Sequence, residues 1–351
     1  MILCHFVICL WLFVQAALLT PVVIALDGDS ITDEETIVKA ETTTIFDRTN
    51  HRELGRIRYY YDTLSGQNKS KGSSSYQSCS TIFILGVGTD MTVTDYKEIA
   101  TRTVQEEPSI VVIISDHNVH NFMKTSVTKY ALLVNAIGEQ IQDLIPTCSE
   151  TEPNARQIII GGHSASGQVA IEAFQQNLLV LPIHGLVGLD PFEIAGTTVD
   201  ESRPLAIPAL YWGFTETTCL VDTKKAAEAA YDLTVQESRI LYLLHNTKGG
   251  EEETITHCAF TDHGCGTWPL LCQLDPLSAP WIHMAVAKSI RIFTSAIHRG
   301  DYHKQQFQMI PEIGWNKISL FVNRDLVLNQ SSSDFKRKDF IQSNLRRISS
   351  P

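Results

Sequence analysis

Short, uninterrupted runs of hydrophobic residues alternate with longer amphipathic stretches through the middle of the chain. The runs predict strands at 81–85, 109–115, 157–160, 183–189, 206–213 and 239–244. The amphipathic stretches predict helices at 127–144, 167–177, 224–233 and 281–298. Continuous rather than alternating hydrophobic strands are typical of a parallel sheet covered on both faces. The pattern therefore predicts an α/β fold with a mostly parallel central sheet and helices on both faces.

Weaker patterns flank this region on both sides. Strand-like stretches at 43–46 and 57–61 precede it, and another at 318–322 lies in a tail with basic residues. We therefore expect a leader at 1–25, N-terminal strands and a polar loop at 26–78, a main domain at 79–305 and a C-terminal extension at 306–351. Within the main domain, Asp95 followed three residues later by Glu98 predicts the N-terminal cap of a helix.

The first 25 residues contain no acidic residue, lysine or arginine, and they are mostly apolar from Phe6 onward. This composition favours a cleaved secretory signal peptide that ends near Ala25. The run is also long enough to be a retained membrane anchor, which stays open as an alternative. We therefore expect the chain to enter the secretory pathway and to be secreted, or to reach a plastid through the secretory route.

Charge and cysteine content narrow the classes of partner. A formal net charge of −11 without a basic stripe does not suit nucleic-acid binding. Two of the eight cysteines, Cys4 and Cys9, lie in the leader, which leaves six in the rest of the chain. An even number of cysteines behind a signal peptide predicts disulfides, with the pairing left open. No CxxC motif is present, so a zinc site is not expected.

The segment from Gln157 to Ala170 combines a buried strand, a tight glycine turn around Ser164 and a helix. A nucleophile elbow has this organisation, because it lifts a serine above the sheet between a strand and a helix. The strand and the helix approach closely there, so the positions two before and two after the serine must be small. Gly162 and Ser166 meet this requirement, although Ser166 replaces the last glycine of the GxSxG motif. We therefore predict that Ser164 is the nucleophile of a hydrolase.

A serine hydroxyl needs an imidazole to take its proton and a carboxylate to orient that imidazole. In the α/β-hydrolase fold the acid and then the histidine follow the serine along the chain. Asp190, at the end of the next predicted strand, is the leading acid, and Glu216 is its rival. For the base we favour His263 in a turn-rich loop, with His257 and His283 as alternatives.

The tetrahedral intermediate of acyl transfer also needs backbone N–H donors for its oxyanion. One is expected at Ala165, directly after the nucleophile, and the other at Gly88 or Thr89 in the turn after the first core strand. Loops 116–126 and 246–280 carry aromatic and apolar side chains, Phe260 among them, and are expected to form much of the pocket rim. Such a rim suits a substrate with a hydrophobic acyl chain or a hydrophobic alcohol.

With these residues the chain resembles the chlorophyllase branch of the α/β-hydrolases and, more distantly, platelet-activating-factor acetylhydrolases and cutinase-like esterases. Gly162-His163-Ser164 matches the Gly-His-Ser elbow of that branch, and Asp190-Pro191 matches the Asp-Pro pair that ends its next strand. The family's histidine lies in a loop before the final helix, which points to His263. The family's elbow continues Arg-Gly-Gly, whereas this chain has Ala165-Ser166-Gly167. The family's His-Gly after the first core strand is Val87-Gly88 here.

The resemblance covers about residues 80–300. It implies hydrolysis of the phytyl ester of chlorophyll to chlorophyllide and phytol, with no metal or organic cofactor. The implied partner is a small hydrophobic ester, and association with a membrane surface fits such a substrate. Two alternatives stay open, because substrate choice depends on loops: a general secreted lipase or esterase, and a hydrolase fold with an incomplete triad that acts as a binding protein.

Overall fold

The computed structural model describes residues 37–63, 79–117, 126–145, 148, 156–192, 200, 202–214, 224–235, 239–244, 257–263, 280–300, 318–322 and 327–328. The chain divides into two compact units, Met1–Glu35 and Thr36–Pro351, and all of these residues belong to the second unit. The predicted leader at 1–25 and the rival acid Glu216 lie outside the described residues. In the described part of the chain, no helix is both long and apolar enough to cross a membrane.

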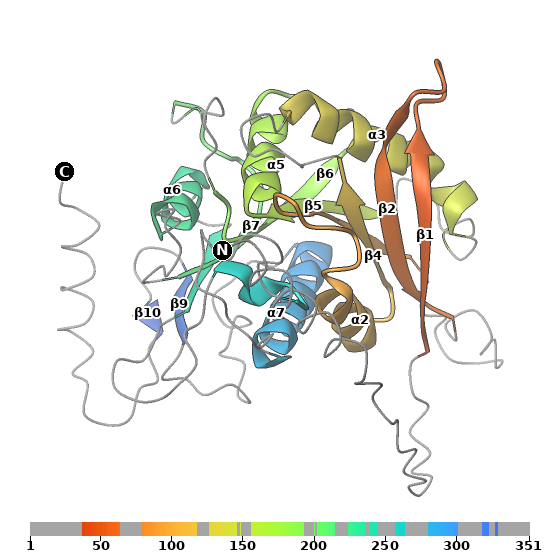
Figure 1. Ribbon diagram of the computed structural model, residues 1–351. Helices are drawn as coiled ribbons and strands as arrows, with labels where there is room; N and C mark the ends of the chain where they lie inside the picture. The colour runs from red at the N-terminus through yellow and green to blue at the C-terminus, as the bar shows by residue number, and fades with distance from the viewer. Residues whose placement is uncertain are drawn as a thin grey trace, which may run out of the picture. The chain divides into compact units, whose positions relative to one another are not determined.

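One sheet organises the described residues, with ten strands in the order β1-β2-β4-β3-β5-β6-β7-β8-β9-β10 (Figure 1). The strands are β1 (Val38–Phe46), β2 (Glu53–Asp62), β3 (Thr81–Gly86), β4 (Ile110–Asp116), β5 (Gln157–His163), β6 (Ile183–Leu189), β7 (Ala209–Phe214), β8 (Arg239–Leu244), β9 (Ile318–Val322) and β10 (Val327–Leu328). Neighbouring strands from β4 across to β8 pair in parallel, whereas β1–β2, β2–β4, β8–β9 and β9–β10 are antiparallel. The predicted α/β class with a mostly parallel sheet is confirmed.

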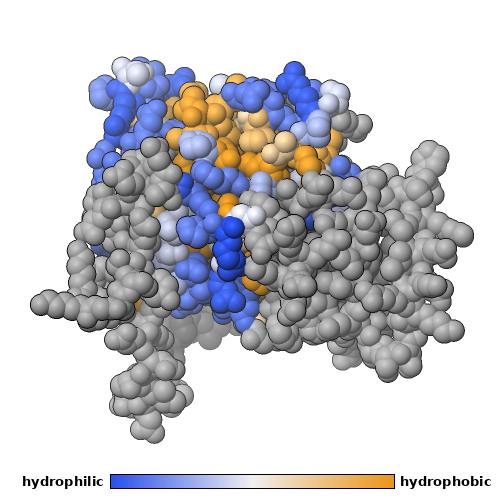
Figure 2. All heavy atoms as spheres, turned by 180° about the vertical axis from the view of Figure 1, so that it is seen from behind, coloured by the Kyte–Doolittle hydropathy of each residue, from blue (hydrophilic) through white to orange (hydrophobic). Residues whose placement is uncertain are grey.

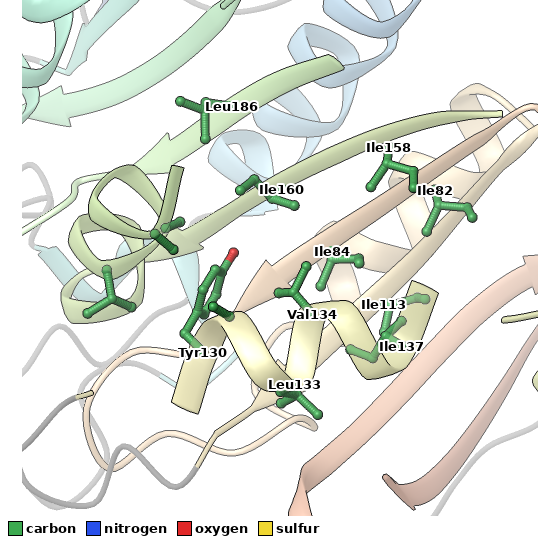
Figure 3. Close-up of a cluster of buried hydrophobic side chains, with 14 of the residues drawn as sticks. Ile82, Ile84, Ile113, Tyr130, Leu133, Val134, Ile137, Ile158, Ile160 and Leu186 are labelled. Carbon is green, nitrogen blue, oxygen red and sulfur yellow. The ribbon is translucent and has the colours of Figure 1, made fainter. Parts of the chain in front are cut away.

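Helices cover both faces of this sheet (Figure 1). They are α2 (Lys97–Glu106), α3 (Val127–Leu144), α5 (Ala165–Gln175), α6 (Lys224–Leu233) and α7 (Pro280–Arg299). Buried side chains of α2 and α7 share one hydrophobic core on one face, and those of α3, α5 and α6 share a second core on the other. The second core is drawn in Figure 3, where side chains of α3 lie over the isoleucines of β3, β4 and β5.

The hydrophobic runs form strands because their two sides enter different cores. In β3, Phe83 and Leu85 belong to the α2/α7 core, whereas Ile82 and Ile84 belong to the α3/α5/α6 core (Figure 3). The same alternation recurs in β4, where Val112 faces one core and its neighbours the other. A strand of a covered sheet has no face in water, so each run is hydrophobic throughout.

The sheet extends beyond the main domain that the sequence predicts at 79–305. β2 pairs with β4 on one side, and β9 pairs with β8 on the other, so the flanking strands complete the same sheet. A disulfide between Cys79 and Cys148 ties the start of β3 to the segment after α3, and Cys258 is also disulfide-bonded. The prediction of disulfides is confirmed at these cysteines.

Hydrophobic side chains also reach the surface. Seen from behind, they gather toward the top of the view between polar borders (Figure 2). Among the described residues, the exposed large hydrophobic side chains are Ile37, Phe46, Leu132 and Val180. Ile37 directly precedes β1, Phe46 ends it, Leu132 lies on α3 and Val180 precedes β6. Single exposed hydrophobic residues of this kind are ordinary on the surface of folded proteins.

Candidate active site

Ser164 lies on a strained turn between β5 and α5. Its backbone has φ 56° and ψ −126°, a region that a residue with a Cβ rarely adopts. Such a conformation costs about 1–3 kcal/mol and persists only where the surrounding structure holds it. Here the Ser164 N–H donates to the carbonyl of Leu189 at 3.0 Å, and the Ser164 carbonyl accepts from Gly167 and Phe192 at 3.0 and 3.1 Å. The strand–turn–helix setting expected of an elbow is therefore present around Ser164.

The small residues around Ser164 are needed for close backbone approach. A Cβ added to Gly162 would lie 2.3 Å from the carbonyl carbon of Ser166. A Cβ added to Gly86 would lie 2.7 Å from the Ser166 Cβ, so Gly86 leaves the room that this extra side chain needs. The Ser166 hydroxyl donates to the carbonyl of Val87. The serine that replaces the motif's last glycine thus fits sterically and ties the elbow to the turn after β3.

Asp190 and His257 form a carboxylate–imidazole pair beside the elbow. Asp190 directly follows β6, is fully buried and donates its N–H to the carbonyl of Trp212 at 2.7 Å. Nδ1 of His257 lies 2.6 Å from Oδ2 of this carboxylate. His257 opens the 3₁₀ helix η4 (His257–Phe260), and its side chain is 10% exposed. The pair therefore combines a fully buried acid with an imidazole that is almost fully buried.

Contacts with the elbow fix where this pair sits. In the sheet, His163 pairs with Leu189, so Ser164 and Asp190 follow adjacent strand ends. The rings of His163 and His257 lie 4.6 Å apart, and Nε2 of His163 donates to the His257 carbonyl at 3.0 Å. The residue before the serine thus contacts the imidazole that the acid orients.

Of the three candidate histidines, the structure brings His257 to Asp190 and not the favoured His263. His263 is exposed just beyond η4. His283 is buried in α7, where Nε2 donates to the carbonyl of Ala259 at 3.0 Å. The turn-rich composition of the loop favours His263, but it does not show that the side chain of His257, the first residue of η4, points toward Asp190. That direction depends on contacts with the elbow, which the sequence does not encode locally.

The cap of α2 also differs from the expectation. The carboxylate of Asp95 accepts from Thr92 and does not cap the helix. Instead Asp262, which lies just after η4, accepts from the Glu98 N–H at 3.2 and 3.3 Å. Burial raises the pKa of Asp262 to about 6. A distant carboxylate at a helix N-terminus gives the same electrostatic benefit as a local cap, and here it also anchors the loop that carries His257.

The predicted oxyanion donors come from the elbow itself and from the turn after β3. Ala165 is the first residue of α5, where backbone N–H groups have no partner within the helix. The Gly88 N–H donates to the Tyr96 hydroxyl at 2.8 Å. The Gly88 N–H is therefore already used, which leaves the Thr89 N–H as the candidate oxyanion donor from the turn after β3.

A second predicted feature, the apolar pocket rim, is only partly covered by the described residues. Phe260 is fully buried rather than at a rim, and its ring packs against His163 and Phe214. Most of loops 116–126 and 246–280 lies outside the described residues.

Burial dominates the electrostatics of the buried histidines His163 and His117. It lowers the pKa of His163 well below its usual value, and nearby His257 acts in the same direction. Burial also lowers the pKa of His117, at the end of β4, to about 3. These two imidazoles are therefore neutral at physiological pH. In the part of the chain that the structure describes, no cluster of histidine, cysteine or acidic residues has the makings of a metal site.

No family model matches the chain, and no curated protein matches it with significant similarity.

Proposed function

We propose that this protein is a serine hydrolase of carboxylic esters with Ser164 as nucleophile, His257 as base and Asp190 as acid. The observation that carries the proposal is the 2.6 Å contact between His257 Nδ1 and Asp190 Oδ2, next to a serine held at φ 56°. The chain order serine, aspartate, histidine and the strand–turn–helix setting of Ser164 are those of the α/β-hydrolase fold. We therefore propose that the α/β architecture described above is an α/β-hydrolase fold.

The proposed reaction follows from the tautomer of His257. In the neutral ring with Nδ1–H donated to Asp190, Nε2 is the acceptor, and it takes the proton from Ser164 Oγ as that oxygen attacks the ester carbonyl. The carbonyl oxygen becomes an oxyanion that accepts from the N–H groups of Ala165 and Thr89. His257 then returns the proton to the departing alcohol, which leaves an acyl-enzyme. Water repeats the sequence with the same base and releases the acid. Each oxyanion donor is worth about 3 kcal/mol of transition-state stabilisation.

The proposed substrate is the phytyl ester of chlorophyll, a small hydrophobic ester that the enzyme would meet at a membrane surface. The support is the resemblance of Gly162-His163-Ser164 and Asp190-Pro191 to the chlorophyllase motifs. The departures from those motifs at Ala165, Ser166 and Val87 bear on substrate choice rather than on the triad. The second candidate, a general secreted esterase, uses the same residues and differs only in the ester accepted.

The test compares the purified wild-type chain with Ser164→Ala on chlorophyll a and on p-nitrophenyl butyrate. Ser202→Ala, which removes an exposed loop hydroxyl, is the matched control. Wild type and Ser202→Ala should hydrolyse ester, and Ser164→Ala should not. Hydrolysis of the short ester alone would overturn the chlorophyll assignment but keep the esterase. Absence of hydrolysis of every ester, together with no labelling of Ser164 by a fluorophosphonate, would overturn the function and favour a binding protein.

A further inference from the structure

The residue before the nucleophile, His163, has two hydrogen bonds that run in opposite directions. Its ring is fully buried. Nε2 lies 3.0 Å from the main-chain carbonyl of His257, on the base side of the site. Nδ1 lies 2.8 Å from the hydroxyl of Tyr96, on the side of the turn after β3. The imidazole therefore spans the space between two segments that the proposed reaction must hold in register.

The proton positions in this network follow from its acceptors. A carbonyl oxygen only accepts, so Nε2 of His163 must carry the hydrogen, and a neutral ring then leaves Nδ1 as an acceptor. The Tyr96 hydroxyl proton has two acceptors within reach, Nδ1 of His163 at 2.8 Å and Sδ of Met91 at 2.9 Å. A ring nitrogen is the stronger acceptor, because thioether sulfur accepts only weakly.

The Tyr96 oxygen then has lone pairs left for the turn. The Gly88 N–H donates to it at 2.8 Å. Packing supports the same arrangement, because a Cβ added to Gly88 would lie 3.0 Å from His163 Nδ1 and 3.3 Å from the Tyr96 oxygen. Burial raises the pKa of Tyr96 well above its usual value, so its hydroxyl stays protonated. The donors and acceptors of the network are therefore matched, and the side chains of His163 and Tyr96 are fully buried.

We infer that His163 and Tyr96 are positioning residues of the proposed esterase, which together hold the main chain of His257 and the oxyanion turn at Gly88–Thr89 in one fixed geometry. The inference rests on the proposed function for its catalytic consequence. Neither residue reacts with the substrate. Buried networks that are fully paired hold a unique arrangement, and a misplacement of about 1 Å in catalytic groups is enough to lower a rate about 100-fold.

The test breaks the His163–Tyr96 hydrogen bond from either end. His163→Gln keeps a donor near Nε2 and removes the acceptor for Tyr96, whereas Tyr96→Phe removes the hydroxyl from the other end of the same bond. Both variants should lower kcat on p-nitrophenyl butyrate by about 10- to 100-fold and leave KM within about twofold. The double variant should be no slower than Tyr96→Phe, because both changes break the His163–Tyr96 bond and Tyr96→Phe alone also removes the acceptor of the Gly88 N–H. Leu132→Ala, an exposed position on α3, is the control for nonspecific effects.

A second measurement does not depend on activity. In ¹⁵N spectra of the wild-type chain at pH 7.5, His163 should appear as the neutral tautomer with the hydrogen on Nε2, and Tyr96→Phe should shift its Nδ1 resonance. The opposite tautomer, or folded variants with wild-type kcat, would overturn the inference while the esterase stands. If the wild type hydrolyses no ester, the proposed function fails, and the tautomer measurement still decides whether the network exists.

Discussion

Nδ1 of His257 lies 2.6 Å from Oδ2 of Asp190, although 67 positions separate the two residues in the chain. The acid comes from the end of β6, and the histidine comes from the start of η4 after β8. The carboxyl ends of parallel strands meet at one edge of a sheet, and that edge is where α/β folds bind ligands. The sheet therefore explains why the pair forms beside Ser164.

Alanine substitutions can test whether His257 or His263 is the base. His257→Ala should lower kcat/KM for ester hydrolysis by about a thousandfold or more, because the nucleophile loses its base. His263→Ala should keep wild-type activity, because the exposed His263 is not the partner of Asp190. Initial rates on p-nitrophenyl butyrate, with folding checked by circular dichroism, measure both. The reverse result would assign the base to His263.

The strain at Ser164 predicts an unusual stability effect. Glycine replacing alanine normally lowers the free energy of unfolding by about 0.5–1 kcal/mol. At φ 56° the order should reverse. Ser164→Gly should be more stable than Ser164→Ala by about 1 kcal/mol, because glycine adopts this backbone region without cost.

Urea denaturation of the two inactive variants provides the measurement for Ser164. The same exchange at Ala170, in the middle of α5, is the control and should follow the normal order. An alanine variant at 164 as stable as the glycine variant would mean that the turn stores no strain.

Buried neutral histidines predict loss of stability in acid. The pKa of His117 in the folded state is about 3, below that of an exposed histidine in the unfolded chain. Between these values the unfolded state binds the proton and the folded state does not. Stability should therefore fall as the pH falls below about 6.5, by about 1 kcal/mol for this residue between pH 6 and pH 5.

His163 and His283 contribute in the same direction, since burial lowers both of their pKa values. The raised pKa of Asp262 acts oppositely, because there the folded state binds the proton more readily. His117→Phe should flatten the dependence of unfolding free energy on pH, measured by urea titrations at several pH values. His298→Gln, at an exposed histidine, should leave the slope of wild type. An unchanged slope in His117→Phe would mean that His117 is protonated or exposed in the native state.

The disulfide between Cys79 and Cys148 closes a long loop, with a sequence separation of 69. By the chain-entropy argument, Cys79→Ala/Cys148→Ala should lose about 4 kcal/mol of unfolding free energy, because the unfolded chain regains that loop's freedom. Denaturant midpoints under non-reducing conditions measure the loss. A change below about 1 kcal/mol would contradict a stabilising role for the bond.

Much of the core of the fold was predictable from local pattern. The strand at 183–189 and the helices at 127–144 and 224–233 have the predicted bounds. Their patterns are clear because a central strand buries both of its faces, whereas each helix buries one hydrophobic stripe. The hydrophobic pattern predicts the flanking strands but not that they belong to the same sheet. β2 and β9 join it through hydrogen bonds to β4 and β8, and such pairing has no local signature in sequence.

The candidate site likewise combines features that are local in sequence with contacts that only the tertiary structure brings about. The sequence alone determined the strand, tight turn and helix around Ser164 and pointed to Asp190, because an elbow and a strand end are local features of neighbouring residues. Only the tertiary structure decided that His257 meets the acid, that Asp262 rather than Asp95 caps α2, and that His163 reaches both Tyr96 and His257. Each of these contacts joins residues from different loops, and where a loop directs its side chains depends on the packed elements beneath it.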